Sequence, residues 1–535
     1  MKRILTVLAV SVPLAAVAVY APIGASAYTG SSASAPFTCS SIKVHAPAGT
    51  KVESVTPVSQ AAGTVTVPGE LGGSVPDVPA YCDVTVVLTH PGDGDHAKVR
   101  VWLPATGWNG RFQALGGSAY AAGDNGLGMA AAVKQGYAAA TTDAGVGEAR
   151  DTSWALNSRG QVNTALLENF ADRSQHETAV VGKEVVDEVY GKAASYSYFN
   201  GCSTGGRQGY MAAQRHPDDF DGILATAPAI NWDEFEVATL WPQVVMNEEH
   251  TYPTTCEFKA FNEAALKACD KLDGAKDGLI EAPERCTYDP RRLIGTKVEC
   301  DDAEETITAA DAAVVRKIWD GPRTSSGKKL WYGLPIGADF AYLADTDTDD
   351  NGNVKGAPFV VPAAWVSTFV KKQPSFDTST LTYRQFAQVF MQSQAEYGEV
   401  IGTDDPDLSA FRKAGGKLLT WHGQADQLIP TQGTVDYRKR VEREMGGSNR
   451  VDDFYRLFLA PGTAHCGLTG KADGLGALTT WVEQGKAPET LTATLTNAYG
   501  QTLTRDLCRY PLVSRYNGHG DVAAAGSYRC AASRG

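Results

Sequence analysis

The chain has 535 residues, more than one ordinary hydrophobic core holds, so we expect a large domain that carries a second domain or a big insertion. Its net charge of −13 at pH 7 argues against a polyanionic partner such as a nucleic acid. Its ten cysteines are an even number, which in an exported chain indicates up to five disulfides.

The first residues are typical of an export signal. Two positive charges precede an apolar run from residue 4 to about residue 20, and Ala25-Ser26-Ala27 is a small-residue cleavage site. The alternative is a membrane anchor, but Pro13 and Pro22 interrupt a run that is barely long enough to span a bilayer. We therefore expect residues 1–27 to be a signal peptide, and the mature chain to be secreted to the extracellular space without a membrane-spanning segment.

Strands and helices alternate after residue 98. Apolar or β-favouring runs at 99–103, 111–115 and 136–142 are separated by Gly, Asn and Asp, which is typical of strands and turns. In the segment 176–190, Val181, Val185 and Val189 recur every four residues, and Gly191 follows where a helix could end. This alternation predicts an α/β fold with a mostly parallel sheet that helices cover on both faces.

The strongest local pattern surrounds a serine. A strand at 196–199, a helix at 206–215 and a strand at 223–227 follow one another, and the turn between the first two contains Gly201-Cys202-Ser203-Thr204-Gly205. This matches the G-x-S-x-G nucleophile elbow, in which a serine hydroxyl projects from a sharp turn and small flanking residues relieve crowding. The amide of Thr204 would donate to the oxyanion. The alternative is a chance match in a glycine-rich chain.

The composition changes after Pro228. Tryptophans and four cysteines gather there, polar stretches are typical of loops, and the α/β rhythm returns only at 417–421. We therefore expect a catalytic core formed by 28–230 and 406–535, with 231–405 inserted as a lid domain over the active site.

The acid and the base should follow the nucleophile, because the triad of α/β-hydrolases has the chain order Ser, Asp, His. Asp426 lies on the loop after the strand at 417–421, at the end where catalytic side chains gather in such sheets. His465 lies in a glycine-flanked loop after the apolar run 454–459, whereas His519 lies in a polar tail. The sequence thus predicts Asp426 as the orienting acid, His465 as the general base and His422 as a structural residue.

Two cysteines adjoin the predicted catalytic residues. Cys202 precedes Ser203 and Cys466 follows His465, so a bridge between them would hold the nucleophile beside the base. Acyl transfer depends on that alignment, because small displacements between reacting groups can slow a reaction by orders of magnitude. Our hypothesis is that this disulfide belongs to the catalytic scaffold. The alternative is that it only holds a long chain together.

These elements together resemble the tannase and feruloyl esterase family. Its signature is a Cys-Ser, a later Asp, and a His-Cys joined by a disulfide, and the chain has Cys202-Ser203, Asp426 and His465-Cys466. The resemblance runs from about Cys39 to Cys530 and includes the blocks 216–222 and 422–426.

The resemblance implies an α/β-hydrolase core with a large lid, and hydrolysis of esters of hydroxycinnamic or gallic acids, with one branch acting on a terephthalate monoester. It also implies a second oxyanion donor in the Gly116-Gly117-Ser118 turn, for which we choose Gly117. Many relatives carry a longer glycine run at this place.

The resemblance also implies a metal site. Asp270, Asp273 and Asp277 could converge on one hard cation, and the carbonyls of Ala275 and Leu279 would complete an oxygen shell that suits Ca²⁺. Without the resemblance, the spacing departs from an EF-hand loop and the segment could equally be a solvated acidic turn. With it, we expect structural calcium that stabilises the lid, because serine-based acyl transfer needs no metal.

The same resemblance implies three further disulfides, and two cysteines then remain for each other. The expected pairs are Cys39 with Cys82, Cys269 with Cys286, Cys508 with Cys530 and, from the remainder, Cys256 with Cys300. No organic cofactor is expected, because no G-x-G-x-x-G motif opens a helix after a strand.

We therefore expect a secreted serine carboxylesterase that acts through an acyl-enzyme on small aromatic esters or on feruloylated or galloylated plant polymers. Feruloyl esters of cell-wall polysaccharides are the first choice, because an exported enzyme meets them outside the cell. Galloyl esters, the substrates of tannases, are the second choice. A catalytically silent binding protein is disfavoured because all three triad residues are present, and a secreted peptidase is chemically possible because the same triad cleaves amides.

Overall fold

The computed structural model describes residues 39–69, 72–300, 304–348 and 354–532. The expected signal peptide, residues 1–27, lies outside these ranges. Among the helices within them, none is long and apolar enough to cross a lipid bilayer.

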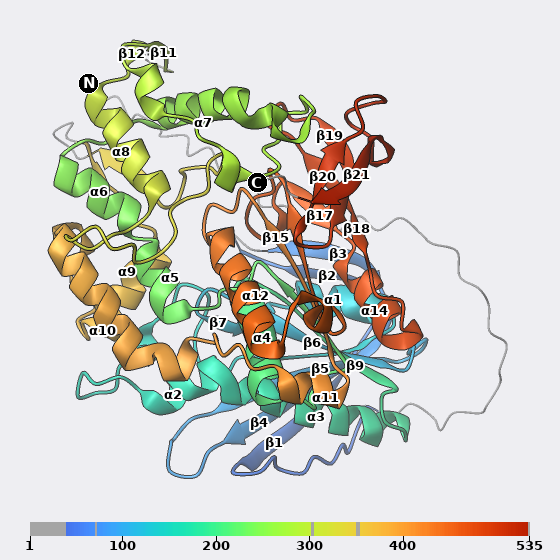
Figure 1. Ribbon diagram of the computed structural model, residues 1–535. Coiled ribbons are helices and arrows are strands. Elements are labelled where there is room, and N and C mark those ends of the chain that lie inside the picture. Colours follow the sequence, from blue (N-terminus) through green and yellow to red (C-terminus); the bar gives the residue numbers. More distant parts are fainter. Residues whose placement is uncertain (1–38, 70–71, 301–303, 349–353, 533–535) are drawn as a thin grey trace, which may run out of the picture.

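A central sheet organises the fold (Figure 1). Its strands are β1 (Lys51–Gln60), β4 (Tyr81–Thr89), β5 (Ala97–Pro104), β6 (Arg111–Ser118), β7 (Ala121–Gly123), β8 (Ala138–Thr142), β9 (Tyr196–Cys202), β10 (Gly222–Thr226), β15 (Lys417–Gly423) and β16 (Tyr455–Ala460). They follow the order β1-β4-β5-β8-β6-β9-β10-β15-β16, and β7 pairs with β6. From β8 to β16 in this order neighbours run parallel, whereas β1, β4, β5 and β8 pair antiparallel. The expected mostly parallel α/β sheet is confirmed.

Helices cover both faces of this sheet. On one face lie α1 (Leu127–Lys134) and α14 (Gly474–Gln484), and on the other lie α3 (Ser174–Tyr190), α4 (Thr204–Arg215) and α12 (Thr431–Met445). The spacing that predicted α3 places Val181 and Val185 in the core, and Gly191 ends the helix with φ 66°. Because both faces are covered, every residue of β8 and β10 is buried.

The chain between β10 and β15 adds no strand to the central sheet within its described residues, and the expected insertion 231–405 lies in this segment. Its helices α6, α7 and α8 lie at the upper left of Figure 1, and α10 lies below them at the left. The backbone N–H of Asn231 donates to the carbonyl of Gly402 at 2.6 Å, so both ends of the segment between them meet. The helices are α5 (Trp232–Ala238), α6 (Trp241–Glu249), α7 (Thr255–Cys269), α8 (Ala309–Asp320), α9 (Val360–Ala364), α10 (Tyr383–Ile401) and α11 (Ser409–Ala414).

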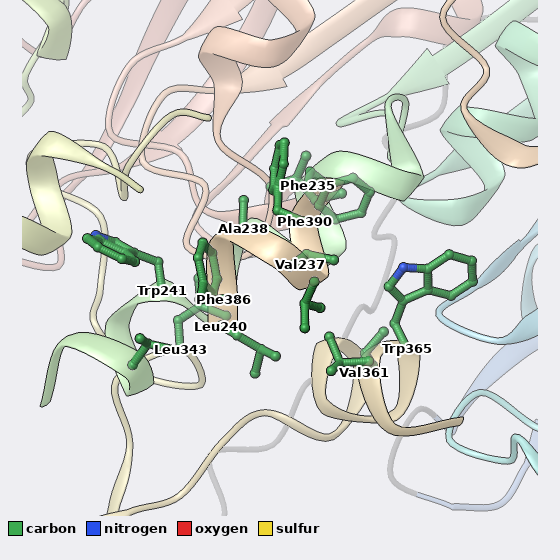
Figure 2. Packing of buried hydrophobic residues seen from close by; sticks show 14 of the residues in the cluster. Phe235, Val237, Ala238, Leu240, Trp241, Leu343, Val361, Trp365, Phe386 and Phe390 are labelled. Atoms are coloured by element: carbon green, nitrogen blue, oxygen red, sulfur yellow. The ribbon is translucent and has the colours of Figure 1, made fainter. Parts of the chain in front are cut away.

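The inserted helices have an apolar core of their own. Figure 2 shows the side chains of Phe235 from α5 and Phe390 from α10 gathered in one part of it. Trp365 is fully buried and stacks on Phe369 with ring centroids 4.6 Å apart. Ile429, from the loop after β15, belongs to the same cluster. This core therefore continues into the loop that follows Asp426.

The chain after β16 forms, besides α14, small antiparallel sheets that the sequence did not predict. Leucines of two of these strands pack beneath β15 and β16, in the same apolar cluster as α14. The strands are β17 (Gly470–Ala472), β18 (Thr490–Thr496), β19 (Thr502–Cys508), β20 (Leu512–Tyr516) and β21 (Tyr528–Ala532), and an N-terminal hairpin is formed by β2 (Gly63–Val67) and β3 (Gly73–Val78).

Candidate active site

The predicted nucleophile lies on the turn between β9 and α4. Ser203 has φ 62° and ψ −121°, a conformation that L-residues rarely adopt. Its N–H donates to the carbonyl of Thr226 at 3.1 Å, and its carbonyl accepts from the N–H of Ala229 at 3.0 Å. Both partners lie at or just after the end of β10, so the neighbouring strand holds the strained turn. This is the backbone geometry of a nucleophile elbow.

Close backbone contacts explain the glycines on either side of Ser203. A Cβ at Gly201 would lie 2.5 Å from the carbonyl carbon of Gly205. A Cβ at Gly205 would lie 3.1 Å from the Cα of Gly116, which belongs to β6. A side chain at position 201 would push α4 away from the turn, so close packing requires glycine at this position of the motif.

The structure brings the predicted acid and base into direct contact. Nδ1 of His465 lies 2.8 Å from Oδ2 of Asp426. Asp426 is fully buried, and its Oδ1 accepts from the N–H groups of Leu428 at 2.9 Å and Ile429 at 2.8 Å. Burial alone would raise the pKa of Asp426, but the charge of His465 and hydrogen bonds from His422 and His465 lower this pKa below its ordinary value. Asp426 is therefore an ionised acceptor for the imidazole.

A disulfide joins the loops of the predicted nucleophile and the predicted base. Cys202 and Cys466 are bonded, with their Cα atoms 5.9 Å apart although 264 positions separate them in the sequence. Ser203 and His465 are the adjoining residues, so the bridge holds their two loops together. Within the described ranges no hydrogen bond joins Ser203 to His465. The other four bridges also pair as expected, namely Cys39–Cys82, Cys256–Cys300, Cys269–Cys286 and Cys508–Cys530.

The two predicted oxyanion donors differ in their contacts. Thr204 is the first residue of α4, and its hydroxyl donates to the carbonyl of Ala119 at 2.7 Å. Its backbone N–H lies in the first turn of the helix, where N–H groups have no partner within the helix. The N–H of Gly117 instead donates to Oε1 of Gln208 at 2.9 Å. This contact conflicts with the assignment of Gly117 to the oxyanion, because its single N–H is already used inside the core.

The residues predicted for a calcium site lie in one buried loop. Burial raises the pKa of Asp270 and raises that of Asp273 to about 6. Asp277 contacts Arg505, and its Oδ2 accepts from the hydroxyl of Tyr528 at 2.9 Å. The five predicted residues are each 3–7% exposed, namely Asp270, Asp273, Ala275, Asp277 and Leu279.

Two other groups of possible metal ligands were not recognised in the sequence, whereas Asp270, Asp273 and Asp277 do not form such a group among the described residues. Ligand atoms lie within 4.8 Å of one another in His176, His216 and Asp219, and in His90, Asp93 and Asp95. The rings of His176 and His216 stack with centroids 4.3 Å apart and an interplanar angle of 14°. Nitrogens of His176, His216 and His90 already face carboxylate oxygens, at 2.9 Å from Asp219, 2.7 Å from Asp172 and 2.7 Å from Asp95.

Nearly the whole chain matches known proteins. The family model for tannase and feruloyl esterase matches residues 82–531. A protein of Arthroderma benhamiae described as a probable feruloyl esterase is 51% identical over 462 residues, which cover 84% of this chain and 85% of that protein.

Solved structures share the fold. Tannin acyl hydrolase from Aspergillus niger superposes with a TM-score of 0.80 at 28% identity, covering 90% of this chain and 92% of the other. Feruloyl esterase B from Aspergillus oryzae gives a TM-score of 0.76 at 28% identity, covering 91% and 98%. The chain therefore belongs to the tannase and feruloyl esterase family and is a carboxylic ester hydrolase.

Proposed function

We propose that this protein hydrolyses feruloyl esters by serine catalysis, with Ser203 as nucleophile, His465 as general base and Asp426 as the acid that orients it. One observation supports the mechanism: the disulfide Cys202–Cys466 joins the loop of the elbow serine to the loop of a histidine whose Nδ1 lies 2.8 Å from a buried carboxylate. This is the arrangement of roles in a serine hydrolase triad.

The reaction runs in two steps. His465 takes the proton from Ser203 as its oxygen attacks the ester carbonyl, and the amide of Thr204 donates to the oxyanion at the N-terminus of α4. His465 then protonates the leaving alcohol, which departs and leaves an acyl-enzyme. Water repeats the sequence and releases the acid. Asp426 keeps the proton of the imidazole on Nδ1 and stabilises the imidazolium that forms in each step.

Feruloyl esters are the first choice of substrate, since the 51%-identical relative and the Aspergillus oryzae structure are both described as feruloyl esterases. A galloyl ester is the second candidate, favoured by the similarity to tannin acyl hydrolase at a TM-score of 0.80. The segment 231–405 is proposed to serve as the lid, because its apolar core continues into the loop after Asp426. A terephthalate monoester and a silent binding role are less favoured.

The Asp270–Leu279 loop is proposed to hold a structural Ca²⁺. The donors suit a hard cation in their chemistry, because the buried carboxylates of Asp270, Asp273 and Asp277 outnumber the guanidinium of Arg505 that contacts Asp277, and the loop would draw them together around the ion. The carbonyls of Ala275 and Leu279 would add neutral oxygens. The ion would offset the repulsion among these carboxylates and take no part in acyl transfer.

Five disulfides favour a secreted protein, because such bridges persist in oxidising compartments. The proposed partners are therefore small aromatic esters or feruloylated plant polymers outside the cell.

Methyl ferulate and methyl gallate, assayed with the wild type and with Ser203→Ala, test the proposal. We expect faster turnover of methyl ferulate, labelling of Ser203 by a fluorophosphonate, and a loss of more than about 10⁴-fold in kcat for S203A. A strong preference for the gallate would replace the feruloyl assignment with tannase activity. Unlabelled, inactive wild type that is folded would reject serine catalysis.

A further inference from the structure

A second histidine lies against the carboxylate of Asp426. His422 comes from the end of β15 and is fully buried. Its Nε2 lies 3.0 Å from Oδ2 of Asp426, the same oxygen that lies 2.8 Å from Nδ1 of His465. The other carboxylate oxygen accepts two backbone N–H groups. Each oxygen of Asp426 therefore has two hydrogen-bond partners, and one of the four is a side chain that the triad does not include.

The contacts of His422 fix which of its nitrogens carries the proton. Nε2 faces two acceptors, Oδ2 of Asp426 and the carbonyl of Ile429 at 3.2 Å, so this nitrogen must be a donor. Nδ1 lies 2.9 Å from the hydroxyl oxygen of Thr434 on α12, which can donate to it. The ring is thus held from both sides, with its Nε2–H directed at the carboxylate.

We propose that His422 is a positioning residue of the triad, whose Nε2–H holds Oδ2 of Asp426 in the orientation that accepts the Nδ1–H of His465. A carboxylate with fewer donors can rotate about its Cβ–Cγ bond, and the terminal torsion of aspartate is broad. When His465 becomes an imidazolium in the transition state, its stabilisation depends on this orientation. The inference rests on the proposed function, since only the triad uses this carboxylate.

The competing explanation is that His422 only ties β15 to α12. The two explanations predict different kinetics. His422 is fully buried and does not meet substrate, so loss of positioning should lower kcat and leave KM unchanged. It should also leave more negative charge on the Asp426 oxygen that faces His465, which favours the imidazolium and moves the acid limb of the pH–rate profile to higher pH. If the role of His422 is purely structural, its loss should lower the Tm and change neither kcat nor the acid limb.

Two substitutions distinguish the contributions of Nδ1 and Nε2 of His422. In His422→Asn the amide can replace Nδ1 at Thr434 but is too short to reach Asp426. In His422→Gln the amide extends to about the position of Nε2 and can donate to the carboxylate. His90→Asn is the matched control, because His90 is also buried and bonded by carboxylates, those of Asp95 and Glu177, on the turn between β4 and β5.

The experiment measures kcat and KM for methyl ferulate from pH 4 to 9, with the Tm of each variant. For H422N we expect a fall in kcat of about 10-fold to 100-fold, a KM within about twofold of wild type, and an acid limb displaced to higher pH. H422Q should recover most of the lost kcat. H90N should have a lower Tm, with the wild-type kcat at temperatures below its melting range.

Equal kcat values and equal acid limbs in H422N and H90N would overturn the positioning role while the esterase assignment stands. An H422Q variant as impaired as H422N would also overturn it, because a restored donor should rescue turnover. A folded wild type that hydrolyses neither methyl ferulate nor methyl gallate and takes no fluorophosphonate label would overturn the proposed function and this inference together.

Discussion

Leu279, in the proposed calcium loop, packs directly against Gly462, in the loop that carries His465. A Cβ at position 462 would lie 2.4 Å from Cδ2 of Leu279, and Gly462 has φ 58°. The hydroxyl of Thr469 closes the same loop by donating to the carbonyl of Gly462 at 3.1 Å and accepting from the N–H of Ala464 at 2.8 Å. The histidine loop is therefore braced by a segment almost 200 positions earlier in the chain.

Gly462→Ala tests this brace. The new methyl group must displace Leu279 or the loop itself, so we expect kcat to fall by about tenfold because His465 moves relative to Ser203. Gly160→Ala is the control, since Gly160 has φ 69° and a Cβ there would meet no atom within 4 Å. It should lose only about 1 kcal/mol of stability and no activity. Equal kcat values for the two variants, from initial rates on methyl ferulate, would contradict the prediction.

The double variant Cys202→Ala, Cys466→Ala should impair turnover more than folding. Without the bridge, the loops of Ser203 and His465 keep their hydrogen bonds but lose their mutual alignment, so kcat should fall by about 10-fold to 100-fold. Cys508→Ala, Cys530→Ala is the control, because that bridge joins β19 to the C-terminal strand. It should lower the Tm with kcat unchanged at 25 °C. A normal kcat in the first double variant would reject the catalytic role of the disulfide.

The proposed calcium site should depend on pH. Burial raises the pKa of Asp273 to about 6, so in metal-free protein this carboxyl is neutral at low pH and its ionisation costs stability as the pH rises through about 6. Calcium needs the ionised form, so added CaCl₂ should raise the Tm of dialysed protein at pH 7.5 and much less at pH 5. Asp273→Asn should abolish the shift, whereas exposed Asp187→Asn should keep it. A calcium-independent Tm at pH 7.5 would reject the site.

Glu236 on α5 should limit stability at alkaline pH. Burial raises its pKa to about 8 from an ordinary 4.5. The folded chain therefore keeps a proton that the unfolded chain releases, and stability that is complete below about pH 4.5 is lost as the pH rises toward 8. Glu236→Gln should be more stable than wild type at pH 8 to 9, on the order of a few kcal/mol, and equal to it at pH 4.5. Exposed Glu188→Gln should show no such difference in urea unfolding.

Much of the site could be predicted because its signals are local. The elbow is specified by Gly201 and Gly205, whose backbones lie in close contact only four positions apart in the sequence. The strand before Asp426 has a clear apolar pattern. The contact between Gln208 and Gly117 could not be predicted, because it joins a helix to a strand 91 positions away. The contact between His422 and Asp426 could not be predicted either, because a spacing of four on a strand and its following loop does not by itself bring two side chains together.

The antiparallel strands at both ends of the chain were also missed. β18 alternates buried and exposed residues, yet its threonines give little hydrophobic contrast, and β1 is mostly exposed. Such strands gain their place from neighbours distant in sequence, so short-range patterns indicate them weakly.

The hydrogen bond between Asn231 and Gly402 makes the inserted segment a separable module of the fold. Because the intervening segment leaves and re-enters the core at one point, its length and content can change while β10 and β15 keep their register, from Gly222 opposite Lys417 to Thr226 opposite Trp421. The whole lid segment could thus be exchanged during evolution without disturbing the central sheet. Relatives with the same hydrolytic residues could then differ in the acids they release.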